Sequence, residues 1–163
     1  MNLNSYSRYR TIKNFYKYFT DLYLESIKMD SFSKSDFEKR FTINNIELLN
    51  KYFKQGQSVV FMCSHYSGYE WCACLPYFIK HNFLAVYTPV KNKYINDFMK
   101  KSRSRHGLAL ISRYDALKKI SILEKKNKKP HLYGLVADQS PQIRTNNYWS
   151  CLLYTSPSPR DLY

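Results

Sequence analysis

The chain has 163 residues, of which 44% are hydrophobic and 17% are aromatic. These values fit a single globular domain, and they exclude a disordered tail or a pair of full-sized domains. The 26 Lys and Arg residues outnumber the 12 Asp and Glu residues, which gives a net charge of +14. This excess favours an anionic partner such as nucleic acid, anionic lipid or an acidic carrier protein, although a coding bias toward Lys, Asn, Tyr and Ile is an alternative source of it.

Neither a membrane span nor a metal-binding pattern is predicted. No stretch approaches the roughly 20 apolar residues that a spanning helix needs, and the N-terminus lacks the apolar region of a signal peptide. The four cysteines form no C-x-x-C pair, and no cluster of His and Cys residues has the spacing of zinc ligands. Cys72 and Cys74 are therefore expected to pack as small apolar residues in a reduced protein.

Residues 1–56 are predicted to form N-terminal helices. Residues 8–29 repeat apolar side chains at steps of three and four, as is typical of an amphipathic helix; these are Ile12, Phe15, Tyr16, Phe19, Leu22, Tyr23 and Ile27. The segment SKSDFEKR follows, with Ser33 and Asp36 in an N-capping pattern. The segment IELLNKYFKQG indicates a further helix, which Gly56 ends because glycine adopts the left-handed C-cap conformation at low cost.

Residues 57–150 show a different pattern, in which short apolar strands alternate with helices. This alternation predicts the α/β class, with a mostly parallel sheet and crossover helices. The strands are expected at Ser58–Met62, Phe83–Tyr87, Leu108–Ser112 and His131–Ala137, and the helices at 68–80, at 93–105 and from Asp115 to about Lys126. Such sheets bind ligands beyond the carboxyl ends of the strands, where His65 and Asp138 both lie.

The last segment, residues 151–163 (CLLYTSPSPRDLY), has neither helical nor strand periodicity. It resembles the in-frame translation of a transposase-based sequencing adapter, and a natural disordered tail is the alternative. We therefore expect native sequence to stop near Ser150, and we base no inference about fold or site on the tail.

His65 is the histidine whose context suggests chemistry; the other three, His81, His106 and His131, are expected to be structural. His65 follows a buried strand and precedes the small residues Ser67 and Gly68, and Glu70 lies in the first turn of the next helix. An imidazole titrates near neutrality and can take a proton from an attacking alcohol. Glu70, across a tight turn, can bond the other ring nitrogen and fix the tautomer. The H-x-x-x-x-E spacing is common by chance, but its place at a strand end favours a catalytic dyad.

The segment HYSGYEW resembles the H-x-x-x-x-E block of the bacterial lipid A biosynthesis acyltransferases, which belong to the lysophospholipid acyltransferase superfamily. The likeness extends through FYKYFTDLYLESIK, VYTPVKNKYINDFMKKSRSRHGLALISR and GLVADQSP to YWS, in the family's order and with similar spacing. It covers nearly all of residues 1–150, and it is nearest to Bacteroidetes-like members. Four ordered blocks are much more specific than one motif.

This resemblance implies a glycerolphosphate-acyltransferase-like fold, with the catalytic core at 57–150, and transfer of an acyl group from acyl carrier protein to a hydroxyl of a glucosamine-based lipid precursor. The reaction would take place at the cytoplasmic face of the bacterial inner membrane, and anionic lipid and the membrane surface would be partners. His65 takes the family's general-base position and Glu70 that of its orienting carboxylate. A thioester is already activated, so no cofactor or metal is expected.

Five further residues are carried over as substrate-binding candidates: Asn92, Arg103, Arg105, Asp138 and Gln139. The first three lie in the block that the family uses near its anionic lipid, and Asp138 and Gln139 match its D-Q pair. The two arginines can bind phosphate through their planar forks, although a solvated helix face is an alternative for either. For Asp138 the alternative is a capping or turn residue.

Three departures from the family pattern affect these expectations. Ser67-Gly68-Tyr69 stands where Gly-Asn-Trp is common, and Thr88 where a basic residue is usual. The family is also about twice as long, with an N-terminal hydrophobic anchor and further sheet and helices after the D-Q pair. We therefore expect this chain to be an incomplete domain, with weak or absent activity on its own.

Other functions remain open from the sequence. An acyltransferase acting on a lysophospholipid or an aminolipid is one, because a His-carboxylate dyad serves any hydroxyl or amine. A basic nucleic-acid-binding module is another, suggested by the net charge and by aromatic residues beside Lys in NFYKYF and KYFK. No RRM, KH or helix-turn-helix signature appears, and the aromatic residues follow helical spacing, so we expect them in the core and expect no nucleic-acid partner.

Overall fold

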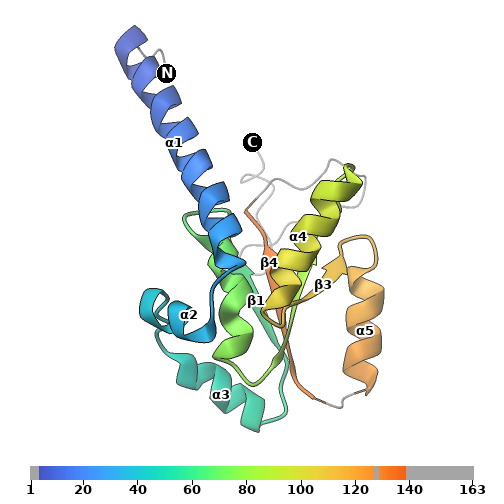
Figure 1. The fold of residues 1–163 in the computed structure, drawn as a ribbon. Helices are drawn as coiled ribbons and strands as arrows, with labels where there is room; N and C mark the ends of the chain where they lie inside the picture. The colour runs from blue at the N-terminus through green and yellow to red at the C-terminus, as the bar shows by residue number, and fades with distance from the viewer. Residues whose placement is uncertain (1–3, 127–128, 139–163) are drawn as a thin grey trace, which may run out of the picture.

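The computed structural model describes residues 4–126 and 129–138. Over this part of the chain, helices precede and then alternate with strands (Figure 1), which confirms the predicted α/β class. In chain order the elements are α1 (Ser5–Met29), α2 (Lys34–Arg40), α3 (Ile46–Lys54), β1 (Val59–Cys63), η1 (Tyr69–Tyr77), β2 (Asn82–Tyr87), α4 (Lys93–Arg105), β3 (Ala109–Ser112), α5 (Ala116–Lys126) and β4 (His131–Val136).

Within the described residues, four strands form one sheet in the order β1-β4-β2-β3, and every neighbouring pair is parallel. β4, the last strand in the chain, therefore lies between β1 and β2. Gly134 makes this arrangement possible, because a Cβ at that position would come within 2.9 Å of the Phe83 ring on β2. The order places the ends of β1 and β4 side by side.

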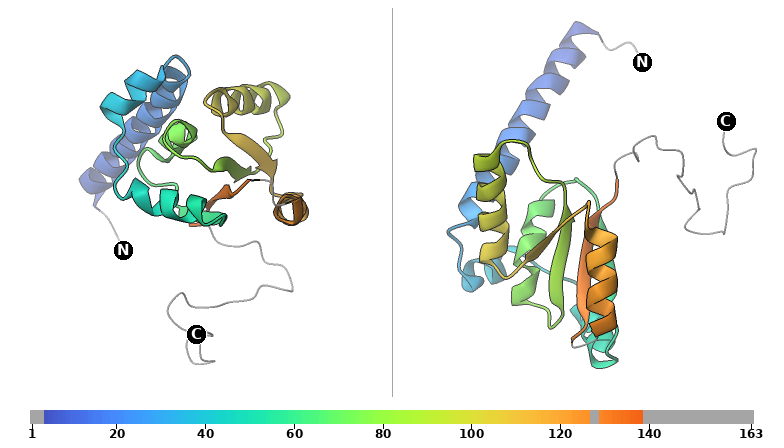
Figure 2. Two further views of the ribbon diagram at one scale, coloured as in Figure 1. Left: turned by 90° about the horizontal axis from the view of Figure 1, so that it is seen from below. Right: turned by 90° about the vertical axis from the view of Figure 1, so that its right-hand side faces the viewer.

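Helices lie on both sides of the sheet (Figure 2), and side chains of the flanking elements pack on both faces of β2 and β4. On one face Leu132 and Phe83 pack with Leu75 and Ile79 of the η1 region, and side chains of α3 join this cluster. On the other face Tyr133 packs with Leu84 and Ile111 against α5. Burial on both faces explains why β2 and β4 are mostly apolar. The prediction that β1 is buried is wrong for one of its faces, because β1 is an edge strand and exposes Val60 and Met62.

A third buried cluster joins the N-terminal helices to η1. Phe37 and Cys74 are fully buried there beside Met29, the last residue of α1. Cys72 packs against the main core, so both cysteines pack as apolar residues, as predicted. Burial raises the pKa of Cys72 to about 11 and that of Cys74 to about 12, which keeps both thiols protonated.

Helix α1 begins at an N-cap, where the Asn4 side chain accepts a hydrogen bond from the Ser7 N–H at 2.8 Å. The helix then extends well beyond the sheet (Figure 1), and its aromatic side chains, including Phe15, Tyr16 and Phe19, are exposed. The prediction that these aromatic residues form core is therefore wrong. Helical spacing identifies a common face, but it does not provide an element to cover that face.

The segment predicted as a helix across 68–80 is instead a 3₁₀ helix, η1, with Pro76 inside it. Proline lacks the N–H that an α-helix requires and clashes with the preceding turn, and the tighter 3₁₀ geometry accommodates short segments of this kind. The other predicted elements are found within three residues of their expected bounds. In the part of the chain that the structure describes, no helix has the length and apolar character needed to cross a membrane.

Candidate functional site

The site is built on the neighbouring strands β1 and β4. Their register aligns Cys63 with Val136, and the Ala137 N–H continues the ladder by donating to the Cys63 carbonyl at 3.0 Å. His65 follows the end of β1 by two residues, and Asp138 follows the end of β4 by two residues. Parallel pairing therefore brings together two side chains that are far apart in the sequence, at the edge where the sequence predicted a ligand.

Two hydrogen bonds join His65 to the Asp138 carboxylate. The backbone N–H of His65 donates to Oδ2 at 2.9 Å, and the ring Nδ1 lies 2.8 Å from Oδ1. Hydrogen bonds from the backbone N–H and then from the ring of His65 hold the pKa of Asp138 below its usual value, so this group is an anionic acceptor near neutral pH. Nδ1 must then carry the proton, which leaves Nε2 as the unprotonated nitrogen of the neutral ring.

Both side chains remain accessible, with 37% of His65 and 35% of Asp138 exposed. The ring of Tyr69 meets that of His65 edge-on, with centroids 5.0 Å apart. Burial, and then the neighbouring Glu70 carboxylate, raise the pKa of Tyr69 to about 12, so Tyr69 stays a neutral phenol. Sequence reasoning missed this contact, and no spacing signal pointed to it.

Glu70 does not bond His65, which corrects the predicted contact within the dyad. Its carboxylate instead accepts hydrogen bonds from Nε (3.0 Å) and Nη2 of Arg103, on the last turn of α4. Only 16% of the Glu70 side chain and 20% of the Arg103 side chain are exposed. The left-handed conformation of Ser67 (φ 54°) turns the chain between His65 and Glu70, so proximity in sequence does not become contact in space.

The loop that carries His65 is held by α1. The Tyr18 hydroxyl donates to the Ser67 carbonyl at 3.1 Å, and the Trp71 indole N–H donates to the Glu25 carboxylate at 3.1 Å. Gly68 lies against the Trp71 ring, where an added Cβ would come within 2.7 Å of the indole. Contacts between residues more than 40 positions apart therefore fix the shape of this loop, and no pattern in the sequence predicted them.

The remaining predicted substrate-binding residues have protein partners or lie outside the described residues. Asn92 is the N-cap of α4, where its side chain accepts from the Ile95 N–H at 3.2 Å. Arg105 pairs with Asp30 at the end of α1, at 3.0 Å. Gln139 lies outside the described residues. Arg103 is a partly buried residue in an ion pair, so the solvated helix face considered for it is not what the structure shows.

The sequence model of a family described as bacterial lipid A biosynthesis acyltransferase matches residues 4–146 of the chain. This match spans the His65 loop, α4 and the residues after β4. The chain belongs to this family. The resemblance inferred from the four motif blocks is thereby confirmed, and acyl transfer within lipid A biosynthesis follows as the kind of function. A comparison with curated proteins found no match.

The other three histidines of this acyltransferase are buried, in keeping with structural roles. His81 Nε2 lies 3.1 Å from the Gln57 carbonyl, and His106 lies between the Tyr77 hydroxyl and the Met29 carbonyl. His131 lies 3.4 Å from the Glu124 carboxylate through Nδ1. Among the described histidines, His65 therefore combines an exposed ring with a carboxylate partner at the carboxyl edge of the sheet.

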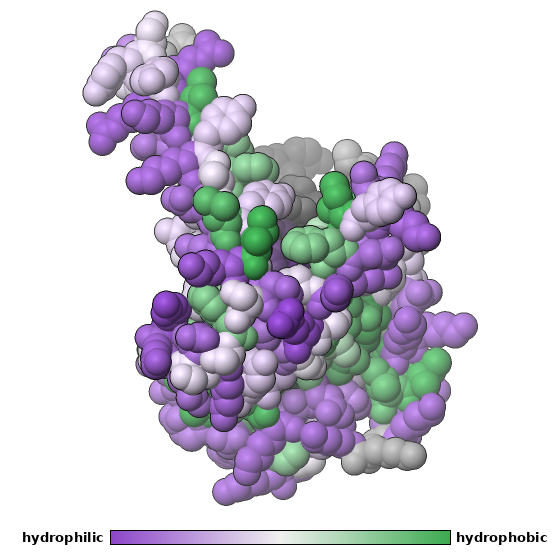
Figure 3. Space-filling model, in the orientation of Figure 1, coloured by the Kyte–Doolittle hydropathy of each residue, from purple (hydrophilic) through white to green (hydrophobic). Residues whose placement is uncertain are grey.

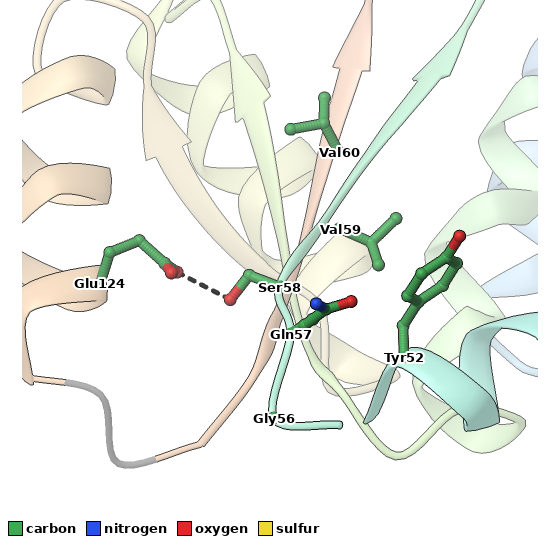
Figure 4. A pocket seen from close by; sticks show the side chains of 7 residues that line it. All are labelled: Tyr52, Gly56, Gln57, Ser58, Val59, Val60 and Glu124. Carbon is green, nitrogen blue, oxygen red and sulfur yellow. Dashed lines mark hydrogen bonds between the residues drawn. The ribbon is translucent and has the colours of Figure 1, made fainter. Parts of the chain in front are cut away.

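Two surface hollows of similar volume lie at opposite ends of the sheet in the acyltransferase. The hollow at the start of β1 has a volume of about 680 Å³ (Figure 4), and its carboxylate, Glu124, is occupied by hydrogen bonds from Ser58 (2.8 Å) and Tyr133 (2.6 Å). These bonds tie α5 to β1 and β4, so we assign Glu124 a structural role. The other hollow, about 630 Å³, adjoins the His65 loop and is lined by Ser64, Tyr66, Ser67 and Tyr69 together with residues of α1 and the α2–α3 connection. It therefore lies beside the loop that carries His65, but neither His65 nor Asp138 lines it.

Proposed function

We propose that this protein transfers a fatty acyl group from the thioester of acyl carrier protein to a hydroxyl of a glucosamine-based lipid A precursor, with His65 as the general base. The observation that supports this most directly is the bond from His65 Nδ1 to Asp138, which directs the basic Nε2 away from the carboxylate. Asp138 thus takes the orienting role that the sequence suggested for Glu70.

In the proposed reaction the acceptor hydroxyl attacks the thioester carbonyl while Nε2 of His65 takes the hydroxyl proton. The carbon–sulfur bond then breaks, and the departing thiolate receives that proton from the imidazolium. Atoms and charge balance without a metal or cofactor, because the thioester already supplies the activated acyl group. The negative charge of Asp138 stabilises the transient imidazolium, and the bond to Nδ1 keeps the ring in one orientation.

Glu70 and Arg103 are proposed to position the site rather than to move protons. Their ion pair connects the first turn of η1 to the end of α4, and thereby sets the distance between the His65 loop and the helix that carries the basic residues. Two N–H groups of Arg103 are occupied by Glu70, and its remaining donors can face an anionic group of the acceptor.

The anionic lipid is proposed to bind along α4, with Asn92 at its start and Arg105 at its end. Asn92 contributes by capping the helix. Arg105 is 56% exposed, so a lipid phosphate can compete with Asp30 for its guanidinium. Asp138 and Gln139 are still proposed to act next to the acceptor. Asp138 would do so indirectly, by orienting the His65 ring. The net charge of +14 supports work at an anionic membrane surface, proposed to be the cytoplasmic face of the inner membrane.

The test is acyl transfer by the enzyme expressed from its natural gene. His65→Ala is expected to lower kcat/KM by about 10²- to 10⁴-fold, as for the loss of a general base, and Asp138→Asn is expected to cause a loss in the same range. Glu38→Gln, an exposed change on α2, is the control and should leave kcat/KM unchanged. Retained activity in His65→Ala would refute the assigned role. Acylation of a lysophospholipid in place of the glucosamine lipid, measured by mass spectrometry of cellular lipids, would refute the acceptor.

A further inference from the structure

Helices α1 and α4 form two arms that extend past the carboxyl edge of the sheet, the edge that carries His65 (Figure 1). They are tied together at their C-terminal ends, where Arg105 bonds Asp30 and the His106 ring lies 3.1 Å from the Met29 carbonyl. From this junction the helices diverge. The Tyr18 hydroxyl bonds the His65 loop from α1, so the arms are fixed relative to the site.

Both arms carry exposed apolar side chains. We call these two surfaces the arm faces, and they consist of Phe15, Phe19 and Tyr23 on α1 and of Tyr94, Ile95 and Phe98 on α4. On α1 an aromatic ladder runs along the helix, with ring centroids 5.9 Å apart from Phe15 to Phe19 and 4.7 Å apart from Phe19 to Tyr23. On α4 the first turns expose Tyr94, Ile95 and Phe98. The space-filling view shows apolar side chains on both arms bordering the hollow between them (Figure 3).

The charges beside the arm faces are strongly biased toward basic residues. Residues 5–20, the outer part of α1, contain four basic residues and no acidic one: Arg8, Arg10, Lys13 and Lys17. The segment 91–101 contains four lysines and one aspartate. Aromatic rings set among Lys and Arg side chains are the composition of helices that lie in the interface of an anionic bilayer, because the rings enter the acyl boundary while the cations meet the headgroups.

We propose that the two arm faces are the surface by which this acyltransferase docks on an anionic lipid bilayer, with the arms in the headgroup layer and the His65 edge turned toward the membrane. The inference deepens the proposed function and rests on it in taking the acceptor to be a membrane lipid. Docking in this orientation brings the lipid to the edge where the His65–Asp138 pair lies, so the acceptor hydroxyl need not leave the interface fully. Positive charge on both arms favours this occupant over a neutral surface.

The test is co-sedimentation of the protein with vesicles of phosphatidylcholine alone, or of phosphatidylcholine mixed with phosphatidylglycerol. Binding is expected to be at least about tenfold stronger to the anionic vesicles and to weaken as salt is raised. Phe15→Gln with Phe19→Gln, and Ile95→Gln with Phe98→Gln, should each weaken binding to anionic vesicles by about tenfold or more. All four side chains are exposed, so the fold should persist, which circular dichroism checks.

The matched control is Leu117→Gln with Ile122→Gln on α5, which removes exposed apolar side chains from outside the arms. It should bind anionic vesicles like the wild type. Wild-type protein that ignores anionic vesicles, or arm variants that bind them as well as the wild type does, would overturn the proposal. So would arm variants that lose only binding to acyl carrier protein, or only self-association in light scattering, because the arm faces would then serve a protein partner or a second copy.

This assay requires no turnover, so its failure can be distinguished from failure of the proposed function. His65→Ala should bind anionic vesicles like the wild type, because His65 lies outside the arm faces. Activity retained in His65→Ala would refute the role of His65 as the base and would not affect the docking proposal. Absence of vesicle binding would refute the docking proposal and would not affect the test of His65 as the base.

Discussion

At the scale of single residues, His65 and His106 have the same side chain in contrasting environments. His65 is exposed and bonded to a carboxylate. His106 is buried, with Nε2 3.1 Å from the Met29 carbonyl and Nδ1 3.1 Å from the Tyr77 hydroxyl. The carbonyl can only accept, so Nε2 carries the proton and Nδ1 accepts from Tyr77. Both ring nitrogens of the neutral form of His106 are thereby satisfied.

This environment predicts a pH dependence of stability. Burial lowers the pKa of His106 below 6.5, so the unfolded chain binds a proton at a higher pH than the folded protein does. The contribution of His106 to the free energy of unfolding should therefore be fully present above about pH 6.5. It should decrease as the pH falls from there through the pKa of the folded state. Urea unfolding at a series of pH values checks this.

His106→Gln is the matched variant for that series, because the amide keeps a donor and an acceptor but does not titrate in this range. Its stability should depend less on pH below about 6.5 than that of the wild type. An equal slope in both proteins would show that other groups cause the acid sensitivity.

At the scale of elements, two ion pairs connect the end of α4 to the rest of the site. Arg103 bonds Glu70 at the start of η1, and Arg105 bonds Asp30 just after α1. The first pair is mostly buried and uses two hydrogen bonds, whereas the Arg105 side chain in the second is 56% exposed. Exposed pairs contribute little to stability, and a largely buried partner that loses its counter-charge is costly.

We therefore predict strong coupling between Glu70 and Arg103 in a double-mutant cycle. Glu70→Gln and Arg103→Gln should each destabilise the protein, and the double variant should lose less than the sum, by about 0.5–3 kcal/mol. The corresponding cycle on Asp30 and Arg105 is the control and should give a coupling of about 0–1 kcal/mol. Chemical denaturation measures both cycles, and equal coupling in the two would contradict the structural difference.

The sequence predicted elements better than the contacts between them. Periodicity placed nine of the ten elements in residues 4–126 and 129–138 closely, because side chains at helical or strand spacing must share a face. It missed the 3₁₀ geometry of η1 despite Pro76. It also paired His65 with Glu70, because a spacing of five residues measures distance along the chain. The actual partner, Asp138, became visible only once β4 lay beside β1, and strand order is set by tertiary packing.

At the scale of the whole molecule, the described fold depends on a sheet whose central strands, β4 and β2, are covered on both faces. Leu132, on β4, is fully buried between β1 and β2 and contacts the main cluster. Leu132→Ala should cost about 2–5 kcal/mol, as expected for a large-to-small change in a packed core. Leu117→Ala on α5, where the side chain is 88% exposed, should change stability by no more than about 0.5 kcal/mol. Urea unfolding measures both, and similar losses would contradict the assigned core.

The same fold determines how the site faces outward. Parallel strands place their carboxyl ends at one edge, where His65 meets Asp138 and where α1 and α4 extend. The catalytic proposal and the docking proposal therefore refer to the same edge, but they rest on different residues. The order β1-β4-β2-β3 is what makes the first of them possible.

The most direct test of the central claim is the tautomer of the His65 ring, read from two-bond ¹H–¹⁵N correlation spectra recorded where the imidazole is neutral. The signals of His65 are assigned by their loss in His65→Gln. We predict a proton on Nδ1 and a bare Nε2 in the wild type and in Glu70→Gln, and loss of this preference in Asp138→Asn. A proton on Nε2 in the wild type, or a tautomer that responds to Glu70→Gln and ignores Asp138→Asn, would contradict the account.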